Sequence, residues 1–199
     1  KKYSENIVIG HTRWATHGKP NNINAHPHIS MNGKLAIVHN GVIENYDSIK
    51  AQLSQHGYKF KSETDTEILV NLIEYIQKEQ KCSLTNAVTQ TLTHIVGAYS
   101  IVLIDSDNPK KILVAKKGSP LLIGIGKDEY FIASDASPFL SFTKKVVYLD
   151  DGEVAEISTN KLSVITSENQ IKTPHIKKLN IELEEIEKGG YDTFMLKEI

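Results

Sequence analysis

One arginine stands beside the only tryptophan of this chain, and this pair of residue types is suited to binding a carboxylate. The chain has 199 residues and 23 cationic side chains, of which Arg13 is the single guanidinium and the rest are Lys. A guanidinium grips a carboxylate through two parallel charge-assisted hydrogen bonds, which an ammonium cannot reproduce. The alternatives are a buried ion pair for Arg13 and a core position for Trp14. The segment His11–Gly18 is therefore the first candidate for substrate binding.

Asn40 and Gly41 follow an apolar segment and allow two interpretations. An Asn-Gly pair after a strand is ordinarily a tight turn. It could instead form an oxyanion hole, in which the Asn carboxamide and the Gly backbone N–H both donate to a developing negative charge. Removing one such donor typically costs about 3 kcal/mol.

Asp65 lies in the first turn of a predicted helix, where a carboxylate is favoured by the helix dipole. The same carboxylate could bind a substrate ammonium. Arg13 and Asp65 would then match the two charges of a free α-amino acid, provided that the fold brings them together.

Histidines gather in the first fifth of the chain, which holds five of the eight: His11, His17, His26, His28 and His39. The His26-Pro27-His28 spacing is known for metal ligands, but no clustered Cys, Asp or Glu accompanies it. We expect no metal, and expect these imidazoles to order a long loop through hydrogen bonds. Cys82 has no base nearby in the sequence and is expected to be an incidental thiol.

Early helices and later strands must position these residues. Residues 7–10 are predicted as the end of a buried strand, and residues 11–32 as a long polar loop. Residues 34–39 are predicted as a strand that ends at an Asn40-Gly41 turn. Helices are predicted over 46–53, over 64–76 with Thr64 and Glu67 spaced as a capping box, and from Ser83 to Leu92.

A series of strands follows, predicted at 98–105, 112–115, 121–125, 130–133, 146–149, 153–157 and 162–166. This order indicates an α+β fold, with helices packed on mainly antiparallel sheet.

Composition limits the function classes. The formal net charge is −1, which argues against a surface for nucleic acid or an anionic membrane, and no apolar run is long enough to span a membrane. A single cysteine excludes an internal disulfide framework, and the first six residues lack the apolar stretch of a signal peptide. We therefore expect a soluble, cytoplasmic protein.

Several motifs occur together and in order: HTRWATHG (11–18), NAHPH (24–28), HNGVIEN (39–45), SETDTE (62–67) and Gly97-Ala98-Tyr99. In this combination the chain resembles the glutaminase domains of the glucosamine-6-phosphate synthases, which are class II, N-terminal-nucleophile amidotransferases. The resemblance implies a four-layer α/β/β/α sandwich. The closing Gly189-Gly190-Tyr191 and residues 194–199 resemble the exit toward the linker and sugar-isomerase domains of that family.

The resemblance implies roles around the amide that is hydrolysed. Arg13 would bind the α-carboxylate of glutamine and Asp65 its α-ammonium group. Asn40 and Gly41 would form the oxyanion hole.

The resemblance also implies roles for two loops. Trp14, Thr16 and His17 would lie on the loop that closes over glutamine, with Trp14 also gating the passage of ammonia. His26 and His28 would lie on a loop facing the synthase half of the enzyme.

The nucleophile of this family is a cysteine at the mature N-terminus, whose own α-amino group serves as the base. This chain begins with Lys1 and has no cysteine before Cys82. The nucleophile is therefore expected outside this chain, and residues 1–179 are expected to be an amidotransferase domain that is incomplete at its N-terminus. Residues 180–199 are expected to form a helix and an exit segment.

The implied function is hydrolysis of L-glutamine to glutamate, which supplies ammonia for converting fructose 6-phosphate to glucosamine 6-phosphate. No cofactor is expected, the full-length enzyme is expected to be a homodimer, and the chain alone is expected to be inactive. Two alternatives stay open: the glutaminase domain of another class II amidotransferase, and a non-catalytic module that binds glutamine.

Overall fold

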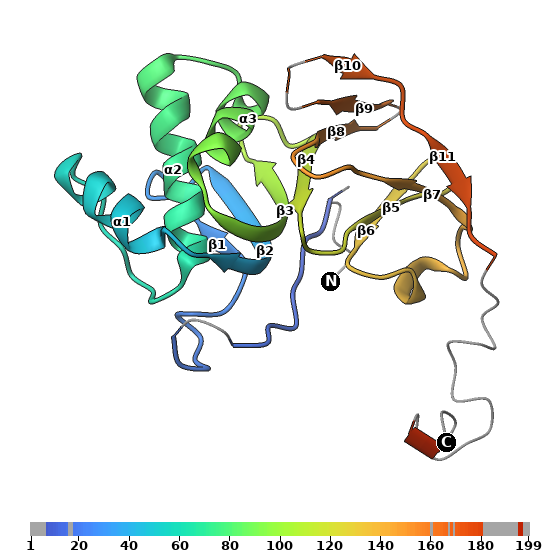
Figure 1. Ribbon diagram of the computed structural model, residues 1–199, viewed down its shortest axis with the longest axis horizontal. Coiled ribbons are helices and arrows are strands. Elements are labelled where there is room, and N and C mark those ends of the chain that lie inside the picture. Colours follow the sequence, from blue (N-terminus) through green and yellow to red (C-terminus); the bar gives the residue numbers. More distant parts are fainter. Residues whose placement is uncertain are drawn as a thin grey trace.

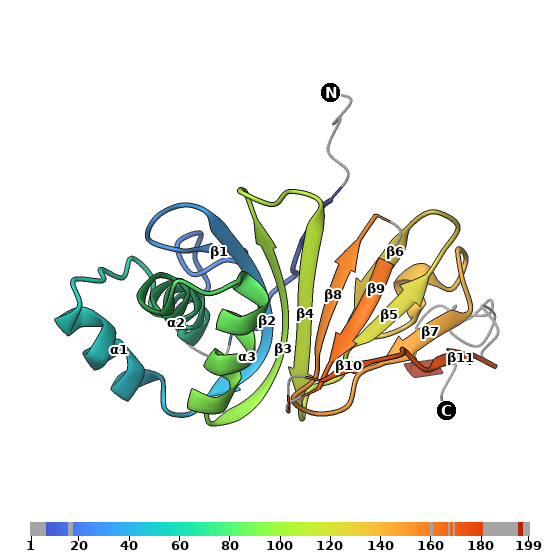
Figure 2. The ribbon, with the colours of Figure 1, turned by 90° about the horizontal axis from the view of Figure 1, so that it is seen from above.

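Two antiparallel sheets and one layer of helices make up the fold. The computed structural model describes residues 7–15, 18–159, 161–166, 168, 170–180 and 195–196. In Figure 2, helices α1, α2 and α3 cover one face of the larger sheet, and the smaller sheet packs on its other face. The α+β sandwich expected from the sequence is confirmed. The described residues make three layers of the expected four, and the predicted helix over 180–188 lies outside them apart from its first residue.

The larger sheet has seven strands in the order β1-β2-β3-β4-β8-β9-β10, and every neighbouring pair is antiparallel. Its strands are β1 His28–Ile29, β2 Leu35–Ile43, β3 Gly97–Asp105, β4 Lys111–Lys117, β8 Val154–Ser158, β9 Lys161–Ile165 and β10 Ile171–Lys172. The smaller sheet has the order β11-β7-β5-β6, with β11 Ile176–Lys178, β7 Lys145–Tyr148, β5 Leu122–Ile125 and β6 Tyr130–Ala133. The seven strands predicted between residues 98 and 166 are thus confirmed within one or two residues, whereas the short strands β1, β10 and β11 were not predicted.

The described chain has three α-helices, α1 Tyr46–Gln55, α2 Asp65–Gln80 and α3 Leu84–His94 (Figure 1), and side-chain caps begin the last two. The Ser83 hydroxyl accepts from the Asn86 N–H, and the Thr64 hydroxyl accepts from the Glu67 N–H. Only this half of the predicted capping box forms. The Glu67 carboxylate accepts instead from the N–H groups of Lys61 and Ser62. It thereby ties the segment before α2 to the helix. A short 3₁₀ turn, Ser137–Phe139, follows β6.

Both faces of the central strands are buried, because helices cover one and the smaller sheet covers the other. Ile101 and Leu103 of β3 pack in the core beneath the helices, whereas the intervening Val102 packs in the core between the sheets. In β4, Leu113 and Val114 divide between the two cores in the same way. Side chains alternate along a strand, so a strand buried on both faces is a continuous apolar run.

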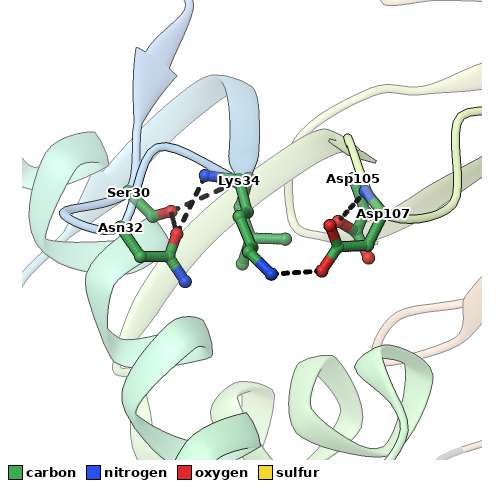
Figure 3. A network of polar contacts seen from close by, with 6 residues as sticks. Ser30, Asn32, Lys34, Asp105 and Asp107 are labelled. Carbon is green, nitrogen blue, oxygen red and sulfur yellow. Dashed lines mark hydrogen bonds and ion pairs between the residues drawn. The ribbon is translucent and has the colours of Figure 1, made fainter.

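A polar network fixes the start of β2 (Figure 3). The Asn32 Oδ1 accepts from the Ser30 hydroxyl at 2.8 Å and from the Lys34 N–H at 2.9 Å. The Lys34 ammonium then pairs with Asp107, which lies just beyond the end of β3. This network holds the β2–β3 register at one end of the strand pair, and the polar segment Asn40–Gly41 lies toward the other end.

Two predictions near the candidate site are wrong. Residues 7–10 form no strand, and Val8 is 84% exposed. The strand predicted over 34–39 does not end at an Asn40-Gly41 turn. It continues to Ile43, because β3 pairs with every residue of β2 from Leu35 onward, and Asn40 and Gly41 face Ser100 and Tyr99. Long-range pairing overrides the local turn preference of Asn-Gly.

Candidate functional site

A cavity of about 150 Å³ lies where β2, the first turn of α2 and the segment 11–14 meet. Its lining brings together residues from four separate sequence motifs: His11, Arg13, Trp14, His26, His39, Asn40, Gly41, Thr64, Asp65 and Thr66. Arg13 and Asp65, which the sequence analysis paired as opposite charges, line the same cavity. Asn40 and Gly41 lie in its wall.

Asp65 is a buried carboxylate whose direction is set by the end of β2. It is 3% exposed, and its Oδ2 accepts from the Ile43 backbone N–H at 2.9 Å. This bond joins the first turn of α2 to β2 across the sheet–helix boundary. The carboxylate is thereby held against one edge of the cavity, where the positive end of the helix dipole also stabilises its charge.

Alternate backbone N–H groups of β2 point toward the cavity. The His39 N–H donates to the His26 Nδ1 at 3.3 Å, and the Ile43 N–H donates to Asp65. N–H groups two residues apart on a strand point to the same edge. The Gly41 N–H therefore points between these two, toward the cavity that Gly41 lines.

Glycine at position 41 is required by the closeness of β3. Its φ is +125°, and a Cβ built there would lie 2.1 Å from the Ala98 carbonyl oxygen. Any side chain would push the two strands apart at the cavity wall.

The guanidinium of Arg13 is oriented by carbonyls of its own loop. Nη1 donates to the Lys19 oxygen at 3.1 Å and Nη2 to the Gly18 oxygen at 3.5 Å. Arg13 itself adopts a φ of +48°, uncommon for a residue with a side chain, and its backbone N–H donates to the His11 Nδ1 at 2.8 Å.

A second set of bonds fastens this loop to the segment before α2. The buried Asn24 side chain donates to the Lys19 carbonyl and to Glu63 Oε2, both at 3.0 Å, and accepts from the Glu63 N–H at 2.9 Å. The Lys19 N–H also donates to Glu63 Oε2. Gly18 lies so close that a Cβ there would be 2.6 Å from Asn24 Nδ2. The carbonyls that orient Arg13 are thus themselves held in place.

The described histidines of the long loop, His11, His26 and His28, make hydrogen bonds that order it, as predicted. His26 contacts the Thr66 hydroxyl through Nε2 at 3.3 Å, and His39 contacts the same hydroxyl through Nδ1 at 3.0 Å. His28 is buried, and its Nε2 lies 3.0 Å from the Thr64 hydroxyl. Burial lowers the pKa of His26 to about 3, with His11 the next contributor, and burial also lowers the pKa of His28. Both rings are therefore neutral near pH 7.

These contacts place Arg13, Asp65, Asn40 and Gly41 around one cavity, together with His11, His26 and His39. A sequence profile described as the glutamine amidotransferase domain matches residues 11–141. This chain belongs to the glutamine amidotransferase domain family. The membership confirms the resemblance that the motifs indicated.

Curated relatives resemble this amidotransferase chain over its whole length. It is 52% identical to the glutamine–fructose-6-phosphate aminotransferase (isomerizing) of Bacteroides thetaiotaomicron across 100% of the chain, and 52% identical to that of Chlorobaculum tepidum across 97%. The enzyme of the same name from Pyrococcus horikoshii is 46% identical across 98% of the chain. The chain covers only 32–33% of these proteins, about one third of their length.

Two solved structures share the fold. The glutamine phosphoribosylpyrophosphate amidotransferase of B. subtilis superposes with a TM-score of 0.65 and 27% identity, covering 81% of this chain and 35% of that one. A structure described as the allosteric regulatory enzyme of purine biosynthesis gives a TM-score of 0.67 and 28% identity, covering 79% and 34%. Structural similarity thus supports the amidotransferase fold independently of the sequence motifs.

Trp14 lines the cavity and is 92% exposed, so the alternative of a core position for it is wrong. Thr16 and His17 lie outside the described residues.

Among the described residues no group of three or more His, Cys, Asp or Glu is arranged to hold a metal ion. Cys82 packs against the core beneath the helices and does not line the cavity.

Reasoning from single residues did not propose a binding or catalytic role for four residues that line the cavity: His11, His39, Thr64 and Thr66. Each lies within a motif already singled out, and Thr64 and Thr66 flank Asp65. The available signal was therefore adjacency to a candidate residue.

In the described part of the chain, no helix is both long and apolar enough to cross a membrane.

Proposed function

We propose that this chain is the glutamine-hydrolysing domain of a glutamine–fructose-6-phosphate aminotransferase, which supplies ammonia for making glucosamine 6-phosphate from fructose 6-phosphate. The observation that carries the proposal is the shared cavity of Arg13, Asp65, Asn40 and Gly41. A cation, a buried anion and two N–H donors around one small space suit an α-amino acid with a side-chain carbonyl. The 52% identity to enzymes of that name supports the choice of acceptor.

The ends of glutamine are bound by opposite charges. Arg13 takes the α-carboxylate through its planar fork, and Asp65 takes the α-ammonium group. The amide carbonyl then lies against the Asn40 carboxamide and the Gly41 N–H. These donors stabilise the oxyanion that forms when a cysteine thiolate from outside this chain attacks the amide carbon. Collapse of that intermediate releases ammonia, and water then hydrolyses the glutamyl thioester to glutamate.

The surrounding loops complete the proposal. Trp14, Thr16 and His17 close over bound glutamine, and the exposure of Trp14 leaves its ring available for that movement. The loop of His26 and His28 faces the synthase half, and the hydrogen bonds of these rings to Thr66 and Thr64 hold the loop in shape.

We also propose the extent of the domain and the assembly of the complete protein. The amidotransferase domain extends to residue 179, which is supported by the buried Leu179, whose N–H donates to the Lys144 carbonyl at 2.8 Å. Residues 180–199 lead toward sugar-isomerase domains of the same polypeptide. The full-length enzyme is a cytoplasmic homodimer that needs no cofactor at this site.

Glutamine affinity tests the assigned role of Arg13. Titration calorimetry is expected to show that Arg13→Lys raises the Kd for glutamine by about tenfold or more, because Lys cannot reproduce a bidentate fork. Lys34→Arg is the matched control, since its ion pair with Asp107 lies at the other end of β2. An unchanged affinity in Arg13→Lys would refute the role.

Covalent labelling tests the reaction. The complete polypeptide is incubated with a thiol-reactive glutamine analogue and its intact mass is measured. We expect one adduct, mapped by peptide sequencing to a cysteine other than Cys82. No adduct would favour the module that binds glutamine without hydrolysing it, and an adduct on Cys82 would contradict the assigned site.

A further inference from the structure

The His11 imidazole joins the Arg13 segment to the Asn40 side chain. Its Nδ1 accepts from the Arg13 backbone N–H at 2.8 Å, and its Nε2 lies 2.6 Å from Asn40 Oδ1. One ring thus contacts the residue proposed to bind the carboxylate of glutamine and the residue proposed to stabilise the oxyanion.

Hydrogen-bond chemistry fixes the tautomer of this ring. A backbone N–H can only donate, so the His11 Nδ1 that receives it carries no proton. The neutral imidazole then carries its proton on Nε2 and donates it to Asn40. The oxygen of the Asn40 carboxamide, and not its nitrogen, must therefore face His11.

The direction of the Asn40 carboxamide decides whether it can serve as an oxyanion donor. Its two ends have nearly the same shape, and a flip would present the carbonyl oxygen to the developing negative charge. With Oδ1 held by His11, the Nδ2 amide is turned away from that ring. Within the described part of the chain no hydrogen-bond acceptor contacts the Asn40 Nδ2, so its two N–H groups are available at the cavity wall.

The His11 ring is itself held in position. Its centroid lies 4.4 Å from that of His26, whose two nitrogens contact the His39 N–H and the Thr66 hydroxyl. The ring is therefore held by a tilted contact with the His26 ring and by hydrogen bonds at both of its nitrogens.

We propose that His11 is a positioning residue, which sets the orientation of the Asn40 carboxamide so that its N–H groups point at the oxyanion site. This inference rests on the proposed glutaminase function, and deepens it by assigning a role to a residue outside the glutamine-binding set. The expected penalty for a misdirected carboxamide approaches that of a lost oxyanion donor, roughly 10²–10³-fold in kcat.

Two substitutions separate the bonds of His11. In His11→Asn the side-chain oxygen can still accept from the N–H two residues on, as in an Asx-turn, but the side chain is too short to reach Asn40. In His11→Gln the longer amide can place an N–H donor near the position of Nε2. The first variant keeps the turn and loses the bond to Asn40, and the second restores that bond.

Kinetics of glutamine hydrolysis by the complete polypeptide then give the main test. We expect His11→Asn to lower kcat by at least about tenfold while the KM for glutamine stays within about threefold, because the bond acts on the transition state. His11→Gln is expected to recover most of kcat. Equal losses in both variants, or a loss confined to KM, would overturn the proposal.

Nitrogen NMR of the histidine side chains in the 199-residue chain provides a test that needs no activity. The Nε2-protonated tautomer is expected for His11, and the Nδ1-protonated tautomer would overturn the proposal. A native chain that does not bind glutamine would refute the proposed function instead. The two failures are therefore distinguishable.

Discussion

Replacing Gly41 by alanine is expected to destabilise the protein strongly, because the backbone of β3 occupies the space of a side chain. The φ of Gly41 is +125°, which an L-residue rarely adopts. A Cβ there would lie 2.1 Å from the Ala98 carbonyl oxygen, 2.7 Å from its carbonyl carbon and 2.9 Å from the Tyr99 Cα. All three atoms belong to backbone, so no side-chain rotation relieves the overlap.

Two contributions set the magnitude. The backbone conformation at Gly41 costs a residue with a side chain about 1–3 kcal/mol. Forcing extra atoms into a packed strand pair costs about 1–3 kcal/mol more. We therefore expect Gly41→Ala to lower the free energy of unfolding by about 4 kcal/mol, a large share of the ~5–15 kcal/mol typical of a domain.

Gly33→Ala provides the matched control. Gly33 also has a positive φ, +80°, but a Cβ built there meets nothing within 4 Å. Only the conformational contribution applies, so we expect a loss of about 1–2 kcal/mol. Urea unfolding followed by circular dichroism, with linear extrapolation to water, measures both variants.

The test is the difference between the losses in free energy of unfolding caused by Gly41→Ala and by Gly33→Ala. Equal losses would show that the β2–β3 separation at Gly41 adjusts freely, and would refute the role assigned to close strand approach. A loss in Gly41→Ala that exceeds the control by about 2 kcal/mol or more would support it.

Two further predictions concern the loops around the cavity. The pKa of His26 is lowered to about 3, chiefly by burial, whereas an unfolded histidine titrates near 6.5. The unfolded chain therefore binds a proton that the native state does not, so this contribution to stability is complete above pH 6.5 and is lost as pH falls toward 3. Unfolding at pH 7, 6 and 5 should show a free energy of unfolding that decreases as pH falls, with a contribution from His26 of at most about 1.4 kcal/mol per pH unit, because one proton is involved. The slope should therefore be smaller in His26→Gln, and equal slopes would contradict this account. Asn24→Asp is expected to lower the free energy of unfolding by about 2 kcal/mol, because it removes both donors to Lys19 and Glu63 and sets two carboxylates together. Adding Glu63→Gln should recover part of that loss, and strictly additive losses in the double variant would refute the contact.

Local signals in the sequence determined most secondary structure. The apolar spacing of Ile68, Leu69, Leu72 and Ile73 identified α2, and Ser83 identified the start of α3, because helix formation depends on residues within one or two turns. The later strands were also predicted, since turn residues separate short apolar runs.

Residue chemistry alone also indicated what the site could bind. Arg13 and Asp65 were paired as opposite charges because of what a guanidinium and a carboxylate can each bind. Family motifs then placed both in an amidotransferase, and the match over residues 11–141 confirmed that placement.

Only the tertiary structure decided whether Asn40 and Gly41 form a turn or a strand. By itself the dipeptide favours a turn, but β3, more than 50 residues later, draws both into a strand. That pairing turns the Gly41 N–H toward the cavity and excludes a side chain at this position. The bond from His11 to Asn40 likewise joins residues 29 positions apart. Such contacts form between segments that are far apart in the sequence, so the residues next to each partner do not predict them.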